Sequence, residues 1–295
     1  MTFQNSQYLV ETDWLAQHLD DPELRIIECS VGMPNYHEDS AGDHIEIVSG
    51  RSDYEQGHIP GADFVDLVTE LRNEDDKLSM FPLPSLELFA AVMSSHGIGE
   101  GVRVVLYDRT MNAWAARFWW MLRSFGFDGA SVLNGGWAKW STENRLSSVT
   151  PSQPAAAKFV ARYRPELIAT KEEVLQAIGE ESSCIINALG PDEFAGQGPV
   201  RYGRPGHIPT SVNVPAMGLA DPHTHAYLDA ETLCEKFAAA GAFDKDRVIT
   251  HCGGGIAASS DAFVLTLLGV ENVALYNGSM MEWAADTELP LEMGI

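Results

Sequence analysis

The sequence predicts an α/β protein made of two tandem domains, each with a mainly parallel sheet flanked by helices. The length of 295 residues fits two domains of about 150 residues each. The chain also repeats itself, because GHIPGADFVDL at 57–67 returns as GHIPTSVNVPA at 206–216, and the stretch 103–140 parallels 247–283. Several landmarks that recur in the same order indicate a duplicated domain. Within each copy, strand-like runs alternate with helix-like runs, which is typical of a parallel sheet.

Each repeat has the same succession of elements. A short β-branched run, at 25–29 and again at 184–188, predicts a buried strand, and the GHIP turn leads into another short strand. A helix is expected at 85–97 and at 229–241, where Ser or Asp can cap the first turn and Gly can end the last. A central apolar strand, a loop, a second helix and a final strand complete each repeat.

A segment rich in Ser, Pro and Ala separates the two repeats. It spans 147–159 and lacks periodic apolar spacing, so it predicts a linker. We therefore expect an N-terminal domain at 1–148, a linker at 149–160 and a C-terminal domain at 161–295.

Composition and charge exclude several classes of partner. Hydrophobic residues make up 45% and charged residues 21% of the chain, as in ordinary globular proteins. The net charge of −23 argues against nucleic-acid and anionic-membrane surfaces. No apolar run reaches the roughly 18 residues of a membrane span, and the N-terminus lacks the features of a signal peptide. Four cysteines without C-x-x-C spacing predict neither a disulfide framework nor a zinc site, so we expect a reduced, cytoplasmic protein.

The stretch THCGGGIAASS, residues 250–260, is the strongest candidate for a site. Cys252 follows the central strand of the second repeat, and a helix is expected about four residues later. Ligands of parallel sheets gather at the carboxyl ends of strands. Clustered amides and helix N-termini lower the pKa of a cysteine thiol, which makes a reactive thiolate. The predicted cradle consists of the amides of Gly253, Gly254, Gly255, Ile256, Ala257 and Ala258.

The alternative is that Cys252 is a buried structural residue and that the glycines only turn the chain. The first repeat weighs against this interpretation, because Asp108 occupies the matching position and no glycines follow it. The fold therefore does not require the loop, and we predict that Cys252 is a catalytic nucleophile.

These residues resemble the tandem-domain rhodaneses, the thiosulfate and 3-mercaptopyruvate sulfurtransferases. The resemblance rests on the two GHIP motifs, the Cys-led loop, and NGGWAKW matched by NGSMMEW, and it covers most of the chain. It implies that Cys252 becomes a persulfide, taking sulfur from a small anionic donor and passing it to a thiol or to cyanide. It implies no metal and no cofactor, a thioredoxin-like dithiol as acceptor, and a chain that works as a monomer.

The uncharged loop CGGGIA favours 3-mercaptopyruvate over thiosulfate as the donor. In the mercaptopyruvate enzymes, arginines outside the loop bind the donor carboxylate, and Arg201 is the better match here, with Arg204 as the second candidate. His58 matches a first-domain histidine that faces the loop in those enzymes, although a purely turn-stabilising role is also open. His207 occupies the equivalent turn of the second repeat, where we expect a structural role.

The chain departs from the family pattern in the loop. Gly254 stands at the position of the family's serine and Ala257 at that of its threonine, and Met280 replaces a tryptophan. These departures leave two alternatives open, a thiosulfate:cyanide sulfurtransferase and a non-catalytic sulfur-binding or regulatory module. A cysteine phosphatase is disfavoured, because Ala258 stands where its loop arginine would be.

Two further segments have weaker signals. His223 and His225 lack a nearby third ligand, so we expect a loop rather than a metal site. The acidic insert at 36–46 is expected to be a solvated loop over the cleft between the domains.

Overall fold

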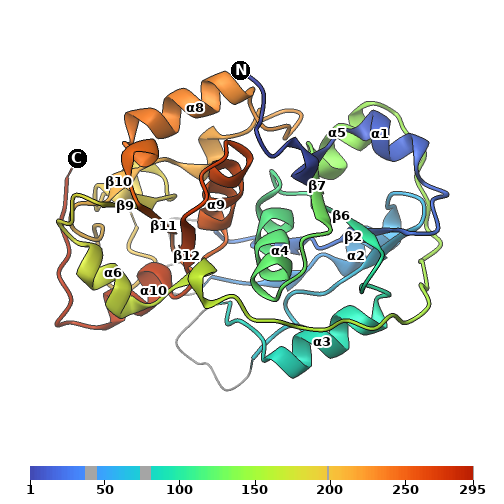
Figure 1. Cartoon of the computed structure of the whole chain (residues 1–295), viewed down its shortest axis with the longest axis horizontal. Coiled ribbons are helices and arrows are strands. Elements are labelled where there is room, and N and C mark those ends of the chain that lie inside the picture. The colour runs from blue at the N-terminus through green and yellow to red at the C-terminus, as the bar shows by residue number, and fades with distance from the viewer. Residues whose placement is uncertain (37–44, 74–80, 198, 295) are drawn as a thin grey trace.

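The computed structural model of the chain describes residues 1–36, 45–73, 81–197 and 199–294. It contains two α/β domains, each built on a five-stranded sheet in which every pairing is parallel (Figure 1). The strand order of the first sheet is β1 (Leu9–Val10), β7 (Ala130–Leu133), β6 (Arg103–Tyr107), β2 (Leu24–Glu28) and β5 (Ala62–Phe64). The order of the second is β8 (Ile168–Ala169), β12 (Val273–Tyr276), β11 (Arg247–His251), β9 (Ser183–Asn187) and β10 (Val212–Asn213).

Helices flank both sheets. The first domain has α1 (Thr12–Gln17), α2 (Arg51–Gln56), α3 (Leu86–Ser95), α4 (Ala113–Ser124) and α5 (Gly136–Thr142). The second has α6 (Lys171–Ala177), α7 (Pro191–Phe194), α8 (Ala230–Ala239), α9 (Ala257–Leu267) and α10 (Ser279–Ala285). Short 3₁₀ turns lie at Ser6–Tyr8, Pro165–Leu167, Ala216–Gly218 and Ala242–Asp244.

The two sheets have the same topology, which confirms the predicted duplication and fold class. Each strand of the first sheet has a counterpart at the same place in the second, with β6 and β11 as the central strands. Asp108 directly follows β6, and Cys252 directly follows β11. One antiparallel pair, β3 (Val31–Gly32) with β4 (Val48–Ser49), has no counterpart among the described residues of the second domain. Residues 37–44 of the acidic insert lie outside the described residues.

The predicted helix caps are present. The Ser85 hydroxyl accepts from the amide of Leu88 at the start of α3, and the Asp229 carboxylate accepts from the amides of Glu231 and Thr232 at the start of α8. Glycines with left-handed backbone follow the ends of both helices. These are the start and stop signals that side-chain capping and αL glycines provide.

The segment that joins the domains is held against the first domain. It contains no helix or strand over 149–160 and runs across the lower half of the view in Figure 1, in yellow-green. The amides of Ser152 and Ala157 donate to the carbonyls of Ala62 and Ser94 at 3.3 and 2.9 Å. The predicted linker is thus extended and hydrogen-bonded along the first domain.

The domains share one continuous apolar core. Helices α4 and α9 pack against each other at the centre of the molecule (Figure 1). The rings of Trp119 and Phe263 meet edge to face with centroids 4.9 Å apart. The N-terminal segment also crosses over, because the amide of Asn5 donates to Leu267 O at 3.1 Å. The loops that precede α4 and α9 are therefore fixed relative to each other.

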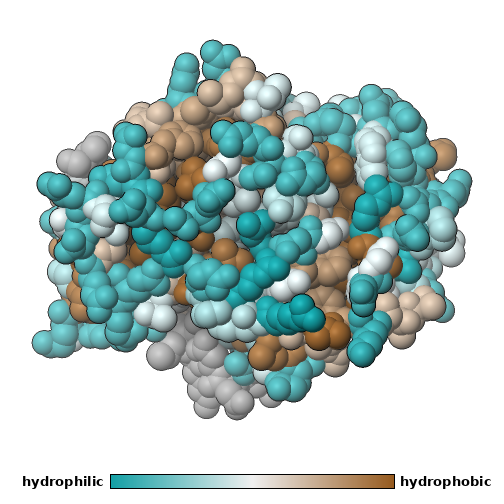
Figure 2. All heavy atoms as spheres, in the orientation of Figure 1, coloured by the Kyte–Doolittle hydropathy of each residue, from teal (hydrophilic) through white to brown (hydrophobic). Residues whose placement is uncertain are grey.

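Hydrophilic side chains cover most of the face seen in Figure 2, as the large excess of acidic residues leads us to expect. Among the described residues, no helix has the length and apolar character needed to cross a bilayer.

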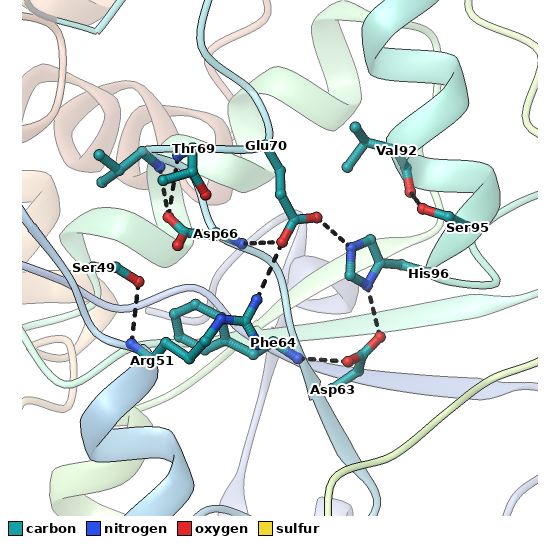
Figure 3. Close-up of polar contacts among 11 residues, drawn as sticks. Ser49, Arg51, Asp63, Phe64, Asp66, Thr69, Glu70, Val92, Ser95 and His96 are labelled. Carbon is teal, nitrogen blue, oxygen red and sulfur yellow. Dashed lines mark hydrogen bonds and ion pairs between the residues drawn. The ribbon is translucent and has the colours of Figure 1, made fainter.

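A charged cluster joins β5, α2 and α3 of the first domain (Figure 3). The imidazole of His96 lies between two carboxylates, with Nδ1 2.7 Å from Asp63 Oδ2 and Nε2 2.7 Å from Glu70 Oε2. Arg51 Nη2 approaches the other oxygen of Glu70 at 3.2 Å. Burial disfavours the charged imidazole, but the hydrogen bonds and charges of Asp63 and Glu70 outweigh it and raise the pKa of His96 to about 9.

Replacing His96 by Gln is expected to lower the free energy of unfolding by about 2 kcal/mol at neutral pH. The folded-state pKa is higher than the unfolded value of 6.5, so the stabilisation is complete below about pH 6.5 and is lost as the pH rises through about 9. Urea unfolding of both proteins at pH 6, 8 and 10 measures this difference. A destabilisation that is the same at all three pH values would show that His96 does not act as a cation.

Candidate active site

The Cys252 loop is fixed by the start of α10. Cys252 is 2% exposed, and its amide donates to Ser279 Oγ at 3.1 Å. Its carbonyl accepts from the amide of Met280 at 3.0 Å, and the carbonyl of Gly253 accepts from Met281 at 3.0 Å. The chain after β11 is therefore turned back by the first turn of a neighbouring helix, which orients the sulfur toward its own loop.

Two of the three glycines have a steric reason to be glycine. Gly255 has a φ of +86°, a left-handed conformation that a side chain disfavours. A Cβ on Gly253 would overlap the hydroxyl end of the Tyr202 ring. The glycines thus let the loop curl tightly and let a tyrosine pack directly against its backbone.

One backbone amide of the loop already donates to the sulfur. The amide of Gly255 lies 3.1 Å from Cys252 Sγ. Within the part of the chain that the structure describes, five other loop amides have no acceptor, those of Gly253, Gly254, Ile256, Ala257 and Ala258. Unpaired amides that precede a helix are ready donors to an anion.

The first domain holds a carboxylate in the equivalent loop. Asp108 Oδ1 accepts from the amides of Thr110 and Asn112 at 2.6 and 3.1 Å, and Oδ2 accepts from the amide of Ala115 at 2.8 Å. Burial raises the pKa of Asp108, and these amides oppose the shift. In both domains, backbone amides of the loop after the central strand therefore donate hydrogen bonds to a side chain of that loop. The side chain is a carboxylate in the first domain and a thiol in the second.

The first domain also contacts the Cys252 loop through α4. Arg117 Nη2 donates to Phe81 O at 2.9 Å, and Asn277 Nδ2 of the second domain donates to the same carbonyl at 3.3 Å. A Cβ built on Gly255 would lie 3.3 Å from Arg117 Nη1 and 3.2 Å from Asn277 Oδ1. A pocket of about 100 Å³ adjoins Arg117, lined largely by apolar residues of the first domain and by Ile256 of the loop.

A pair of tyrosines covers the other side of the loop. The hydroxyls of Tyr36 and Tyr202 are 3.3 Å apart, and Tyr36 also donates to Glu193 Oε1 at 3.5 Å. Burial raises the pKa of Tyr36 to about 12 and that of Tyr202 well above its usual value, so both hydroxyls keep their protons at neutral pH.

Arg201 is the predicted substrate residue that the structure brings to this cluster. Its Nε donates to Tyr36 O at 3.1 Å, its guanidinium lies over the Tyr36 ring, and Nη1 is 3.6 Å from Glu193 Oε1. It also lines a second pocket together with Tyr202 and Met280. Its charge thus lies beside the tyrosine pair, with one carboxylate close by.

Backbone carbonyls occupy hydrogen-bonding groups of Arg204 and His58, so a part in substrate binding stays a prediction for both residues, although Arg204 lines the same pocket as Arg201. Arg204 donates to four backbone carbonyls between 283 and 289, so it clamps the C-terminal segment. His58 is fully buried, and its ring nitrogens lie 2.7 Å from Tyr54 O and 3.0 Å from Thr150 O. Backbone carbonyls occupy both nitrogens, so His58 holds the end of the first domain together.

His207 and His225 are structural links. His207 Nδ1 lies 2.7 Å from Phe194 O and the ring stacks on Phe194, which agrees with the expected structural role. His225 Nδ1 accepts from the amide of Met111, so the 221–228 segment docks on the first domain. Across the described ranges, no three potential metal ligands come together.

Residues that surround the loop without a recognisable motif are Tyr36, Arg117, Tyr202, Asn277 and Ser279. Two of them belong to the first domain, so the spacing around Cys252 could not reveal them. One available signal was the buried-looking arginine in the apolar stretch AWAARFWW. A charged residue in such a stretch requires a partner or a function.

Comparison with known proteins assigns the family. The sequence model of the family described as Rhodanese-like domain matches residues 11–143 and again residues 170–286. The chain is 33% identical to the 3-mercaptopyruvate sulfurtransferase of Escherichia coli K12, over 98% of this chain and 99% of that protein. It is 31% identical to the thiosulfate sulfurtransferase of Bos taurus, over 93% of this chain and 91% of that protein.

Comparison with solved structures supports the same family assignment. The crystal structure of SseA from Escherichia coli, reported for the "Rhodanese" fold and catalytic mechanism of 3-mercaptopyruvate sulfotransferases, superposes with a TM-score of 0.79. It has 33% sequence identity, and the match covers 92% of this chain and 98% of that one. An anaerobic ergothioneine biosynthesis enzyme from Chlorobium limicola has a TM-score of 0.83, with coverage of 99% and 72%, but only 21% identity, which shows the shared fold alone.

Proposed function

The chain belongs to the rhodanese family and is a tandem-domain sulfurtransferase, and we propose that it transfers sulfur from 3-mercaptopyruvate to a thiol through a persulfide on Cys252. The transferred atom passes through the loop Cys252–Ala258, which follows the central strand of the second domain.

In the first half-reaction, the thiolate of Cys252 attacks the sulfur of the donor. The S–S bond forms as the C–S bond of the donor breaks, and the electron pair of that bond leaves on pyruvate enolate, which takes a proton. In the second, the thiolate of the acceptor attacks the outer sulfur of the persulfide. The Cys252 thiolate is released and the acceptor carries the sulfur away, so no external oxidant or reductant is needed.

The observation that carries this proposal is a loop with one amide that donates to Cys252 Sγ and further amides that have no acceptor among the described residues. The amide of Gly255 donates to the sulfur, and neighbouring amides have no acceptor in the described part of the protein. Amides fixed in this way stabilise a negative charge wherever it forms, because they need no reorganisation during the reaction. A persulfide anion extends one sulfur farther than a thiolate, and the unpaired amides are suited to bind that outer atom.

Arg201 is our candidate for the donor carboxylate. Arg201 is the arginine beside the tyrosine pair, whereas the guanidinium of Arg204 donates its hydrogen bonds to backbone carbonyls. A guanidinium can bind a carboxylate with two parallel hydrogen bonds. The loop itself has no cationic side chain, which favours a carboxylate-bearing donor over thiosulfate. The proposed acceptor is a dithiol of the thioredoxin type, and a monomer suffices because both domains of one chain build the site.

Steady-state kinetics test this choice of donor. We expect kcat/KM for 3-mercaptopyruvate to exceed that for thiosulfate by at least about tenfold, with parallel double-reciprocal lines when the thiol acceptor is varied. Arg201→Met is expected to lower kcat/KM for 3-mercaptopyruvate by about 10²-fold while leaving the melting temperature nearly unchanged. A higher kcat/KM for thiosulfate would instead make the chain a thiosulfate:cyanide sulfurtransferase.

A further inference from the structure

Arg117, on helix α4 of the first domain, lies buried beside the Cys252 loop and has no anionic partner among the residues that the structure describes. It is 2% exposed, and no carboxylate of the described residues pairs with it. Its Nη2 donates to Phe81 O, while Nη1 has no hydrogen-bond partner among the described residues. Arginines are almost never buried without a counter-charge, because the desolvation of an isolated cation is costly.

The unpaired nitrogen points at the loop. Nη1 lies 3.3 Å from the position that a Cβ of Gly255 would occupy, and Gly255 is the residue whose amide donates to Cys252 Sγ. The guanidinium and the sulfur thus lie next to the same glycine. Burial lowers the pKa of Arg117 to about 10, and the negative charge of Cys252 opposes that shift. Arg117 therefore remains protonated at neutral pH.

The loop itself lacks Lys, Arg and His between Cys252 and Ser260. An anion that forms there during transfer has the loop amides as neutral donors, and one buried positive charge can add to them. In a site closed to water, such a charge acts more strongly than it would at a surface.

We propose that Arg117 is a positioning residue of the first domain that stabilises the anionic sulfur of Cys252, as thiolate and as persulfide, across the domain interface. This inference rests on the proposed transfer of sulfur at Cys252. It also gives the first domain, which has Asp108 in place of a cysteine, a direct part in the reaction: it supplies the cation that the catalytic loop lacks.

The pH dependence of alkylation of Cys252 by iodoacetamide tests the inference without any donor. Of the titratable groups in the described residues, Tyr36 and Tyr202 lie near Cys252, and His251 directly precedes it in β11. Both tyrosines keep their protons below about pH 9, and burial lowers the pKa of His251 to about 3. Arg72 lies across the adjoining pocket and Glu193 beside Arg201. Peptide mass spectrometry assigns the alkylation to Cys252.

In Arg117→Met, we expect the pH of half-maximal alkylation to rise by at least about one pH unit, and sulfur loading at pH 7 to slow by about 10- to 100-fold. Arg117→Gln keeps a donor for Phe81 O but has no charge, and it should show the same rise. Arg117→Lys should restore much of the wild-type profile. The matched control is Arg123→Met, on the same helix, whose guanidinium contacts Tyr8 and Trp119 and whose profile should not move.

Each uncharged variant of Arg117 is first checked for a cooperative melting transition, which shows that it is folded. If a folded variant has the same alkylation profile as the wild-type protein, the role of Arg117 is overturned, whatever the turnover of that variant. The two proposals fail separately. If the wild-type protein accepts sulfur but the profile does not move, only the inference about Arg117 is lost. If the profile moves but the wild-type protein accepts no sulfur from any donor, the proposed function is lost and the electrostatic contact stands.

Discussion

Replacement of Cys252 by Ser is expected to lower the rate of sulfur transfer by at least about 10³-fold with every donor. The serine hydroxyl occupies nearly the same space, so the fold should be kept, but it cannot form a persulfide. Steady-state turnover with 3-mercaptopyruvate and a thiol acceptor measures the loss.

Cys234→Ser is the matched control, because Cys234 is a free, half-buried thiol on α8. Burial raises the pKa values of Cys29 and Cys184, the latter to about 11, so neither is a competing nucleophile at neutral pH. Wild-type turnover in Cys252→Ser would assign the chemistry to another residue, and the loop would then be a sulfur-binding turn.

Gly255→Ala is expected to lower kcat/KM by about 10²-fold or more. Its φ of +86° is strained for alanine, and the new methyl group would meet Asn277 and Arg117 at 3.2–3.3 Å. The loop must shift, and the amide that donates to Cys252 Sγ shifts with it. Loss of one fixed donor to a developing anion typically costs 10²- to 10³-fold in rate.

The control for strain is Gly241→Ala, at the end of α8. Gly241 has a φ of +72° and no atom within 4 Å of its built Cβ. Both variants should lose about 1–2 kcal/mol of stability from backbone strain, but only Gly255→Ala should lose activity. Equal kcat/KM values in the two variants would show that the Gly255 amide has no part in catalysis.

The fold could be predicted because two similar sequence repeats encode the same domain. The recurrence of GHIP and of the central strand with its following loop established two copies of one strand–helix unit. Capping residues such as Ser85 and Asp229 act through their own first turns, so local sequence located the helix starts well. The hairpin β3–β4 was missed because two-residue strands have no periodicity to detect.

The part of the candidate site that could be predicted is the part formed by one continuous segment of the chain. Cys252 and its glycines are contiguous, and the contrast with Asp108 distinguished them from scaffold. The contacts of Arg117 and Tyr36 depend on how two domains dock, which no spacing along the chain encodes. His58 and Arg204 were selected by their positions in motifs, but most of the backbone carbonyls bonded to them come from distant segments, Thr150 for His58 and residues 283–289 for Arg204.

We propose that Cys252 carries the transferred sulfur. Intact-mass measurement of the purified protein, with and without 3-mercaptopyruvate and in wild-type and Cys252→Ser forms, tests it most directly. We predict that the donor adds one sulfur atom to the wild-type protein, that dithiothreitol removes it, and that the variant gains none. A donor that leaves the wild-type mass unchanged, or that adds the same sulfur to the variant, would contradict the account.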